Sequence, residues 1–425
     1  LNEVSFWAGG RNAGTINNKG DKGFDVSGPD VDKDGFGTYQ PVVDLIIDFN
    51  SPVQPEHFVR QITLDKGVVE SSSLRNGNRV SSLAFCSYPD QVMVLHYESQ
   101  EPKKLNLLLS FATQREQDEV TVNGNQELIL NCQLKNGMEC RTLIKVQQEG
   151  GRLVADKESV RLEDADNCTL FIYIATNYEM DAEKDFRGVA AKEKLDQQIR
   201  QTASYSYQDL LNRHLSDYAH LYQRQELNIA KASDARNALP TPKRLEAYRK
   251  SPTDTGLEEL IFRFGRYLMI QGIWNGMIAA PWGNDYHSNI NFQMVYWLPE
   301  VGNLSECHLS MIDYLKAMRS PFKDGTREYL QAIGEPVDST NDGWIVYTSH
   351  NPFGAGGWQV NLPGAAWYGL HMWEHYSFTQ DTAYLREEAY PMMKELCHYW
   401  EKHLKSLGEG GKGFCSNYQE VDITK

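Results

Sequence analysis

The densest group of polar side chains in the sequence lies in the segment 281–297, which reads PWGNDYHSNINFQMVYW. His287, Asn289 and Asn291 occupy alternate positions, and an extended backbone would point all three side chains to one face. One imidazole and two amides offer hydrogen-bond donors and acceptors without a net charge, which suits an uncharged polyol. The alternative is that the asparagines cap a helix that begins near Phe292.

Tryptophan is concentrated in the second half of the chain, where all but Trp7 of the nine tryptophans lie. Three of them, Trp282, Trp344 and Trp358, lie in segments that we predict to be loops, beside Gly, Asn and Asp. Flat aromatic faces can stack on a sugar ring while neighbouring amides bond its hydroxyl groups, so these residues favour a carbohydrate site. The alternative is that they belong to a core, because large helical domains bury aromatic side chains.

A second motif has the spacing of a metal site. The segment 371–375 reads HMWEH, which fits the HxxEH pattern of zinc peptidases and places His371 and His375 on one helical face. The residues around this motif are apolar, and no third metal ligand is evident among them. We therefore predict a packed helix with polar edges here, and neither a metal site nor another cofactor.

The secondary structure that must position these residues is predicted to change along the chain, from strands to helices. Before residue 178, runs rich in β-branched and aromatic residues alternate with turn clusters, which is typical of antiparallel strands. The runs are 41–49, 90–99, 104–113, 125–134 and 168–176. This pattern predicts an N-terminal antiparallel β-sandwich over 1–177.

The residues after 177 favour helices. Residues 178–255 are charged and helix-favouring, and we expect a helical linker there. Residues 256–425 carry apolar side chains at a spacing of three to four, which predicts repeated helices joined by elaborate loops, without strands. The predicted fold class is therefore multidomain β plus α, with a helical toroid or bundle after the linker.

Composition limits the classes of function. The chain of 425 residues has 57 acidic and 42 basic residues, a net charge of −15, which repels phosphate backbones and anionic membranes. No apolar stretch reaches the ~20 residues that span a bilayer. Its seven cysteines are scattered and odd in number, which fits neither a disulfide framework nor a cysteine-rich zinc site. A neutral or cationic small substrate suits such a surface better than nucleic acid.

The chain resembles the family 95 glycoside hydrolases, which are inverting α-L-fucosidases and α-L-galactosidases. The resemblance spans essentially the whole chain, and its WGxDYHxNINxQMxYW core is long and specific. The matching text includes LNEVSFWAGG (1–10), GFGTYQPVVDLIIDF (35–49), FRFGRYLMI (262–270), WGNDYHSNINFQMVYW (282–297) and LPGAAWYGLHMWEHYSFTQD (362–381). The family's layout implies an N-terminal β-sandwich, a helical linker, an (α/α)6 catalytic barrel, of which this chain would hold the N-terminal part, and a C-terminal β domain.

The resemblance also implies a reaction. Members release terminal α-L-fucose with inversion, and α-1,2-linked fucose in an oligosaccharide or polysaccharide is the expected substrate. An Asn, polarised by an Asp, positions the attacking water, and a Glu protonates the leaving oxygen. The Asn-x-Asn pair corresponds to Asn289 and Asn291, with Asn291 holding the water, and His287 corresponds to a contact near the sugar's C5 substituent. Further candidate sugar contacts are Trp282, His350, Asn351, Trp358 and Trp367.

The chain departs from the family pattern in three places. Family members have residues before the LNE sequence that are absent here. A segment of SRPGxLPANL type is also absent between Ile270 and Gln271. The general-acid Glu of the family stands in an SPEN-like motif, whereas Glu420 lacks the flanking Ser-Pro and is not assigned. We expect an incomplete chain of a larger enzyme, with the acid and the Asp beyond Lys425. We also expect a secreted or periplasmic protein.

Three other functions compete with this interpretation. The first is an α-L-galactosidase of the same family. The second is a carbohydrate-binding protein on a catalytically degenerate scaffold, since no general acid is assigned. The third is the zinc peptidase that HxxEH indicates.

Overall fold

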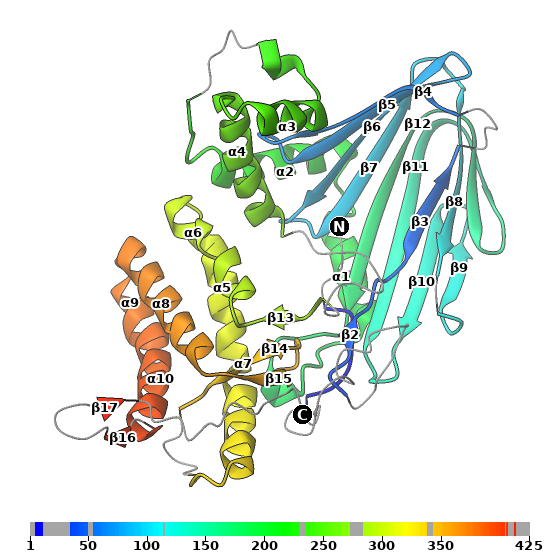
Figure 1. Cartoon of the computed structure of the whole chain (residues 1–425). Helices are drawn as coiled ribbons and strands as arrows, with labels where there is room; N and C mark the ends of the chain where they lie inside the picture. Colours follow the sequence, from blue (N-terminus) through cyan, green and yellow to red (C-terminus); the bar gives the residue numbers. More distant parts are fainter. Residues whose placement is uncertain are drawn as a thin grey trace.

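The chain folds into a β-rich N-terminal part followed by a part made mostly of helices (Figure 1). The computed structural model describes residues 5–11, 35–49, 54–113, 115–229, 235–272, 284–337 and 343–403, and the backbone of 405–406 and 412–413. The N-terminal strands are β1 (Trp7–Ala8), β2 (Thr38–Tyr39), β3 (Asp44–Asp48), β4 (Glu56–Thr63), β5 (Val68–Arg75), β6 (Asn78–Ser87), β7 (Val92–Ser99), β8 (Leu105–Ala112), β9 (Glu119–Asn123), β10 (Glu127–Gln133), β11 (Glu139–Ala155) and β12 (Ser159–Thr176).

Ten of these strands form one antiparallel sheet that folds over on itself. The order is β4-β5-β6-β7-β12-β11-β10-β9, and the pair β3-β8 joins through β12. The long strand β12 is shared, because its residues 159–165 pair with β8 and its residues 167–172 pair with β7. The predicted antiparallel β domain is therefore confirmed, as one folded sheet rather than two separate sheets.

The folded sheet encloses an apolar core. In β8 every second residue is buried, and Leu105, Leu107 and Leu109 are each 0 % exposed. They share one cluster with buried side chains of β10, β11 and β12. The two-residue alternation of the strand thus supplies one apolar face, which the other layer of the sheet covers.

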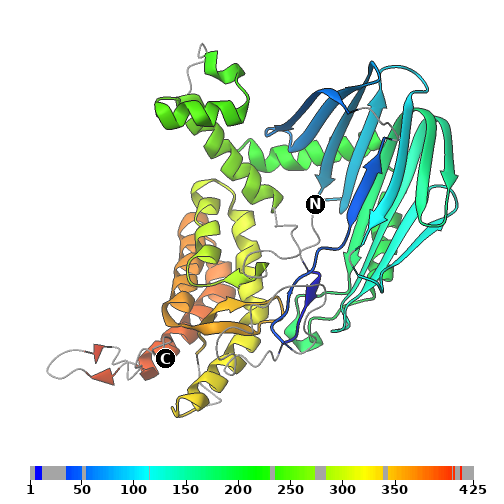
Figure 2. The same cartoon turned by 45° about the vertical axis from the view of Figure 1, so that its right-hand side comes forward.

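Two helices, α1 (Ala191–Thr202) and α2 (Tyr207–Tyr222), cover the other face of the sheet (Figure 2). Leu195 of α1 and Leu210 of α2 are buried in a cluster with side chains of β5, β7, β11 and β12. A capping box fixes the first turn of α2. The segment that we interpret as a linker from the sequence therefore packs closely on the N-terminal domain.

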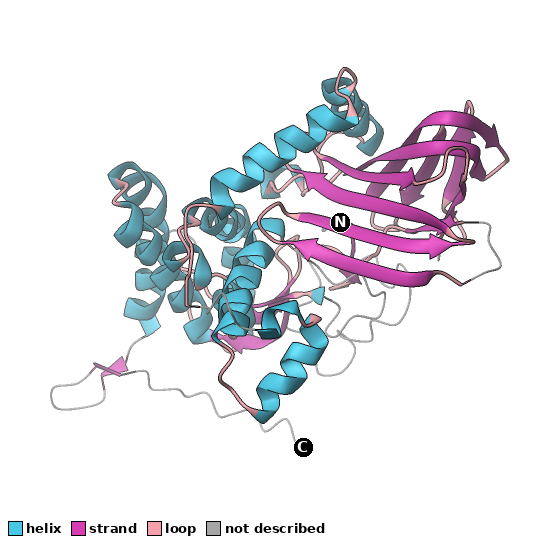
Figure 3. Ribbon diagram, turned by 90° about the horizontal axis from the view of Figure 1, so that it is seen from above, coloured by secondary structure: helices cyan, strands magenta, loops and turns pink. Residues whose placement is uncertain are grey.

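The helical part lies to one side of the sheet (Figure 3). Its helices are α3 (Thr241–Lys250), α4 (Thr255–Gln271), α5 (Asn291–Val295), α6 (Leu298–Val301), α7 (Ser305–Ala332), α8 (Leu362–Thr379), α9 (Thr382–Tyr384) and α10 (Tyr390–His403). Short helical turns η1 (Ala182–Lys184), η2 (Ala235–Ala238) and η4 (Leu385–Ala389) and the strand pair β16 (Lys405–Ser406) and β17 (Lys412–Gly413) complete the described elements. Helix α8 packs against both α7 and α10.

A small antiparallel sheet interrupts the helices, contrary to the prediction of no strands in this part. It consists of β13 (Tyr286–His287), β14 (Val346–His350) and β15 (Gly356–Asn361), in that order. In Figure 1 it lies beside α7, toward the N-terminal part. All five residues of β14 are buried, although three of them, Thr348, Ser349 and His350, are polar. A hydropathy pattern does not identify a central strand of this composition.

One apolar core crosses the boundary between the two parts. Trp7 and Tyr39 of the first strand pair share a buried cluster with Met311 and Met318 of α7 and Met372 of α8. The N-terminal strand pair is therefore packed as part of the helical domain's core.

Asn351 fastens the same boundary with hydrogen bonds. Its side chain is 0 % exposed, and its Nδ2 donates to the carbonyls of Gly10 (3.0 Å) and Phe36 (2.9 Å). Its Oδ1 accepts from the backbone N–H groups of Phe353 and Ala355, each at 3.0 Å. A single buried amide thus satisfies four backbone groups from both parts of the chain.

We predict that Asn351→Leu, which keeps the size of the side chain, lowers the free energy of unfolding by about 3 kcal/mol or more. Four buried backbone groups would lose a partner, and each such loss costs about 1–3 kcal/mol before relaxation. Urea unfolding measures the change. Asn125→Leu, in an exposed turn, is the control and should shift stability by less than about 0.5 kcal/mol. Equal stability of the two variants would contradict the role of Asn351.

Candidate active site

Ser288 lies buried beneath the polar turn 288–291, and both of its backbone groups are bonded. Its N–H donates to the carbonyl of Thr348 at 2.7 Å. Its carbonyl accepts from Gln293 Nε2 at 2.6 Å and from Asn361 Nδ2 at 3.1 Å. Because these partners belong to β14, α5 and the start of α8, three elements hold the turn in place.

The hydroxyl of Ser288 joins a buried polar chain. Its Oγ bonds Tyr368 OH at 2.5 Å and also bonds His350 Nε2, while His350 Nδ1 bonds Tyr314 OH at 2.6 Å. Burial lowers the pKa of His350 to about 3, and the nearby His287 adds to this effect. The imidazole is therefore neutral near pH 7 and bonded at both nitrogens.

The two asparagines of the motif are exposed on this turn. Asn289 and Asn291 both face solvent, but the backbone is extended only as far as His287, so the predicted single extended face is wrong beyond that residue. Helix α5 starts at Asn291, and Ile290 precedes it without any side-chain cap. The alternative that an asparagine caps this helix is therefore also wrong, and both amides remain available to a ligand.

An open pocket adjoins Asn289. Its lining includes Thr348, Gln359 and Asn361, so three amides and a hydroxyl group gather at its wall. Asn361 is fixed because its Oδ1 also accepts from the N–H of Gly364 at 3.2 Å, at the first turn of α8. The pocket offers neutral donors and acceptors, which is the chemistry that a sugar hydroxyl requires.

His287 stands beside this turn, next to a buried acid. Its Nε2 lies 2.8 Å from Oδ1 of Asp285, whose side chain is 0 % exposed. Its Nδ1 lies 3.4 Å from Oγ of Ser349, the residue opposite His287 in the β13–β14 pair. Burial raises the pKa of Asp285, and the contacts with His287 and Ser349 oppose that rise.

The structure changes the expected role of several candidates. His350 and Asn351, which we assigned to sugar contact, are both 0 % exposed and bonded to protein, so they support the site from beneath. Trp344 is 0 % exposed and donates to Glu395 at 3.2 Å, which makes it a core residue. Trp367 is half-buried and packs 6.1 Å from the exposed Trp297, so its sugar contact stays a prediction.

Two predicted contacts lie outside what the structure describes. Trp282 falls among residues 273–283, which are not described. The backbone of Trp358 belongs to β15, but its side chain is not described. Both assignments stay predictions.

Sequence reasoning missed four residues that build the site. Asp285 and Ser288 stand inside the recognised motif, so their position next to His287 and Asn289 was a usable signal. Tyr314 and Tyr368 lie in apolar segments that predict helices. They reach the site only through the packing of α7 and α8 on β14. No local pattern distinguishes them from other core tyrosines.

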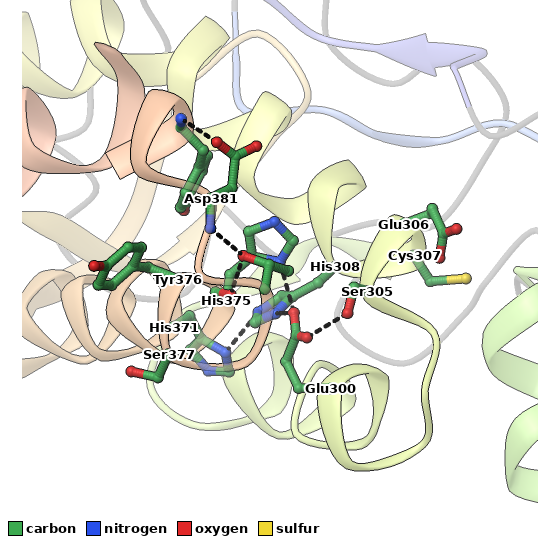
Figure 4. A network of polar contacts seen from close by, with 12 residues as sticks. Glu300, Ser305, Glu306, Cys307, His308, His371, His375, Tyr376, Ser377 and Asp381 are labelled. Carbon is green, nitrogen blue, oxygen red and sulfur yellow. Dashed lines mark hydrogen bonds and ion pairs between the residues drawn. The ribbon is translucent and has the colours of Figure 1, made fainter. Parts of the chain in front are cut away.

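A second polar cluster lies where α6, α7 and α8 meet (Figure 4). Glu300 Oε1 accepts from His308 Nδ1 at 2.8 Å and from His375 Nδ1 at 2.6 Å, and Ser305 Oγ donates to Oε2 at 2.5 Å. Burial alone would raise the pKa of Glu300, but these three donors outweigh it and lower the pKa to about 2. The carboxylate is therefore ionised and fully bonded inside the helical core.

The HxxEH motif leads into this cluster, as Figure 4 shows, but not in the way a zinc peptidase requires. His371 Nδ1 bonds His308 Nε2 at 3.1 Å, whereas His375 bonds Glu300. The potential ligand atoms of Glu300, His308 and His375 lie within 4.8 Å of one another. The group could hold a cation, yet its N–O separations of 2.6–2.8 Å are hydrogen-bond lengths, shorter than the ~3.3 Å between ligands that tetrahedral zinc bonds imply.

Two known domain families match different parts of the chain. Residues 206–417 match the glycosyl hydrolase family 95 catalytic domain. Residues 21–181 match the N-terminal domain of glycosyl hydrolase family 65. The first match contains the candidate site, and the second contains the folded β sheet.

Curated relatives carry fucosidase names. The chain is 28 % identical to "Alpha-L-fucosidase 2" of Arabidopsis thaliana over 400 residues, which are 84 % of this chain and 47 % of the relative. It is 26 % identical to "Probable alpha-fucosidase A" of Aspergillus niger over 398 residues, 87 % of this chain and 49 % of the relative. The chain therefore spans about half the length of the curated relatives it matches.

A solved structure shares the fold. "Putative kojibiose phosphorylase from human microbiome" superposes with a TM-score of 0.57 at 10 % identity, over 88 % of this chain and 51 % of that chain. Among the described residues, no helix is long and apolar enough to cross a membrane.

We predict that EDTA treatment leaves the melting temperature and zinc content of the purified protein unchanged, because internal hydrogen bonds already use the ligand atoms of the Glu300 cluster. Differential scanning fluorimetry and elemental analysis before and after chelation test this. One equivalent of zinc per chain, with a lower melting temperature after its removal, would contradict it.

We predict that acid destabilises the fold through His371. Burial, with a smaller effect of the nearby His308, lowers the pKa of His371 from 6.5 to about 4. The unfolded chain therefore binds the proton first, and stability is lost as the pH falls from 6.5 to about 4, by about 3 kcal/mol. His371→Asn should flatten this pH dependence by up to one proton in urea unfolding at pH 4 to 7.5, whereas the exposed control His220→Asn should keep it. Parallel curves for wild type and His371→Asn would refute the assignment.

Proposed function

The chain belongs to glycoside hydrolase family 95, and we propose that it forms part of an exo-acting enzyme that releases terminal α-L-fucose from glycans, with inversion of configuration. The expected linkage is α-1,2. The observation that carries the proposal is the position of Asn289 and Asn291: two exposed amides on a rigid turn, within the part that matches the catalytic domain. The fucosidase names of the curated relatives support the substrate class.

In this proposal the site recognises a neutral sugar through neutral groups. Asn289 and the pocket residues Gln359 and Asn361 provide amide donors and acceptors for hydroxyl groups. Amides keep their hydrogen-bonding capacity at any pH of interest, so binding would not require a titrating group on this wall. Trp282, Trp358 and Trp367 remain candidate stacking surfaces for the sugar.

The proposed role of Asn291 is to hold the attacking water. The amide oxygen accepts a hydrogen bond from the water, and a carboxylate bonded to the amide NH2 group would shift electron density toward that oxygen. Inversion also requires a general acid on the opposite side of the glycosidic bond, at a distance that leaves room for the water. We assign neither this acid nor the partner carboxylate to a residue of the described part of the chain.

The helical part would belong to an (α/α)6 barrel. Support comes from the match to the catalytic domain and from the packing of α8 against α7 and α10. The site then lies where the β13–β15 sheet and the turn 288–291 meet α5, the start of α8 and the interior of α7.

The test of function is release of free L-fucose from a 2-linked fucosyl oligosaccharide by the full-length protein. Proton NMR during the first minutes should show β-L-fucose, because inversion of an α-linkage yields the β-anomer. Initial release of the α-anomer would refute inversion. Binding of the oligosaccharide without any release would favour the degenerate carbohydrate-binding protein, and preferred release of L-galactose would favour the α-L-galactosidase.

We predict that Asn291→Gly lowers kcat by about 10²–10⁴-fold, the range that one positioned acid–base group contributes. KM should change much less, because the lost contact acts on the water in the transition state. Asn291→Asp should not rescue the activity, since two neighbouring carboxylates would raise a pKa and hold a proton between them.

The control for these kinetics is Asn228→Gly, an exposed asparagine in the loop after α2, which should leave kcat and KM unchanged. Thermal melts accompany both variants. An Asn291→Gly protein with a lower melting temperature but an intact kcat would show that this residue is structural.

A further inference from the structure

Two cysteines, Cys132 and Cys140, lie directly opposite each other in the folded sheet. Cys132 belongs to β10 and Cys140 to β11, which are neighbours in the sheet (Figure 1), and the register of the two strands makes these residues Cα partners. Residues opposite each other point to the same face, so both thiol groups lie on one side of the sheet. Their side chains are only 5 % and 2 % exposed, and both belong to the apolar core that crosses the boundary between the two parts.

The spacing of this pair suits a disulfide bond. Two residues further along β10, the N–H of Leu134 donates to the carbonyl of Met138 at 2.8 Å, so by the alternation of an antiparallel ladder Cys132 and Cys140 form a hydrogen-bonded pair. The Cα atoms of such a pair are about 5.5 Å apart, within the range of about 4.4–6.8 Å that disulfides span. Their Cβ atoms must approach each other by about 1 Å, which makes the bond more easily reduced than an unstrained one.

We propose that Cys132 and Cys140 form a disulfide bond when the protein folds in an oxidising compartment, and that this bond clamps the β10–β11 hairpin to the boundary between the two parts of the chain. The modification lies outside the candidate active site and does not depend on the proposed activity. A secreted or periplasmic location, which we expect from the sequence, would provide the oxidant.

The hairpin carries contacts that hold the N-terminal strand pair. In the turn between β10 and β11, Asn136 Nδ2 donates to the carbonyls of Trp7 and Gly9, each at 2.8 Å. The carbonyl of Asn136 accepts from Arg187 Nη2 at 3.0 Å. A covalent bond between the two strands at the base of this turn would restrict the separated strands in the unfolded chain and so favour the folded hairpin.

The bond forms by thiol–disulfide exchange with a small disulfide such as oxidised glutathione. One cysteine thiolate attacks a sulfur of the oxidant, which gives a mixed disulfide and releases one glutathione thiolate. The other cysteine thiolate then attacks the protein sulfur of the mixed disulfide, forms the Cys132–Cys140 bond and releases the second glutathione. The two cysteine sulfurs lose two electrons, which reduce the oxidant, and the two cysteine protons end on the released thiols.

Burial determines when this exchange takes place. It raises the pKa of Cys132 to about 12, although the guanidinium of Arg115, with Nη2 3.6 Å from Cys132 Sγ, favours the thiolate. The folded protein therefore contains little of the reactive thiolate at neutral pH. We expect the bond to form while the hairpin is still accessible, before the core closes over it.

The experiment maps disulfides in the full-length wild-type protein after export to the periplasm of a bacterial host. The protein is unfolded in urea with N-ethylmaleimide to block remaining thiols, digested with trypsin without reductant and analysed by mass spectrometry. Cleavage after Arg115, Lys135 and Arg141 places the two cysteines in the separate peptides 116–135 and 136–141. They should appear as one species, two hydrogen atoms lighter than the sum of the reduced peptides, that separates on reduction.

Two variants serve as controls for the linkage. Cys132→Ala should abolish the linked species and leave Cys140 labelled. Cys168→Ala should retain it, because Cys168 is equally buried but lies opposite Gln148 and Tyr97 in its neighbouring strands. N-ethylmaleimide on both peptides of the exported wild type would overturn the proposal, and so would a bond from either cysteine to a different one.

The clamp is tested by thermal melts with and without tris(2-carboxyethyl)phosphine. Reduction should lower the melting temperature of the exported wild type and of Cys168→Ala by about 2 °C or more. The melting temperature of Cys132→Ala should not respond to the reductant. Equal melting temperatures of the oxidised and the reduced wild type would show that the bond does not stabilise the hairpin and would overturn that part of the proposal.

Discussion

Ser288 cannot be buried unless each of its polar groups finds a partner, and this requirement organises the candidate site. Its N–H bonds β14, its carbonyl receives side chains from α5 and the start of α8, and its hydroxyl reaches His350 and Tyr368. An unpaired buried group of this kind costs about 1–3 kcal/mol, so the turn has little freedom to rearrange. The exposure of Asn289 and Asn291 on that turn is a consequence of how firmly Ser288 is held beneath them.

The same strand end ties the site to the N-terminal part. His350 is the last residue of β14 and bonds Ser288, while the next residue, Asn351, bonds the carbonyls of Gly10 and Phe36. A displacement of the N-terminal segment would therefore reach the turn through two adjacent residues. The core cluster that joins Trp7 to Met311 makes such a displacement costly, because it would expose buried apolar surface. The β domain thus contributes to the geometry of a site in which none of its described side chains takes part.

How far the sequence predicts this structure depends on whether the signal is local. The strands β3, β7, β8, β10 and β12 coincide with apolar runs, because a half-buried strand must alternate or concentrate apolar residues. Strand β14 was missed, since it is central but polar, and its hydrogen-bonding partners come from distant helices. The motif around His287 identified the site, but the turn at Ser288 depends on Asn361 and Tyr368, which lie more than seventy positions away. The burial of His350 also depends on residues distant in the sequence, so its neighbours along the chain do not predict it.

In the two polar clusters described above, the carboxylate is buried beside histidine side chains. Although the protein carries a net charge of −15, the lining of the candidate pocket is uncharged and consists of three amides, one hydroxyl group and the apolar side chains of Val360, Leu362 and Pro363. Asp285 is buried against His287, and Glu300 is buried against His308 and His375. For Glu300 the hydrogen-bond donors outweigh the cost of desolvation and lower the pKa to about 2, whereas for Asp285 burial prevails and raises the pKa. In the proposed mechanism a carboxylate bonded to the NH2 group of Asn291 would leave the amide oxygen as the group that accepts from the water. The turn 288–291 itself carries only uncharged side chains, so the amides that it exposes act through hydrogen bonds and not through charge.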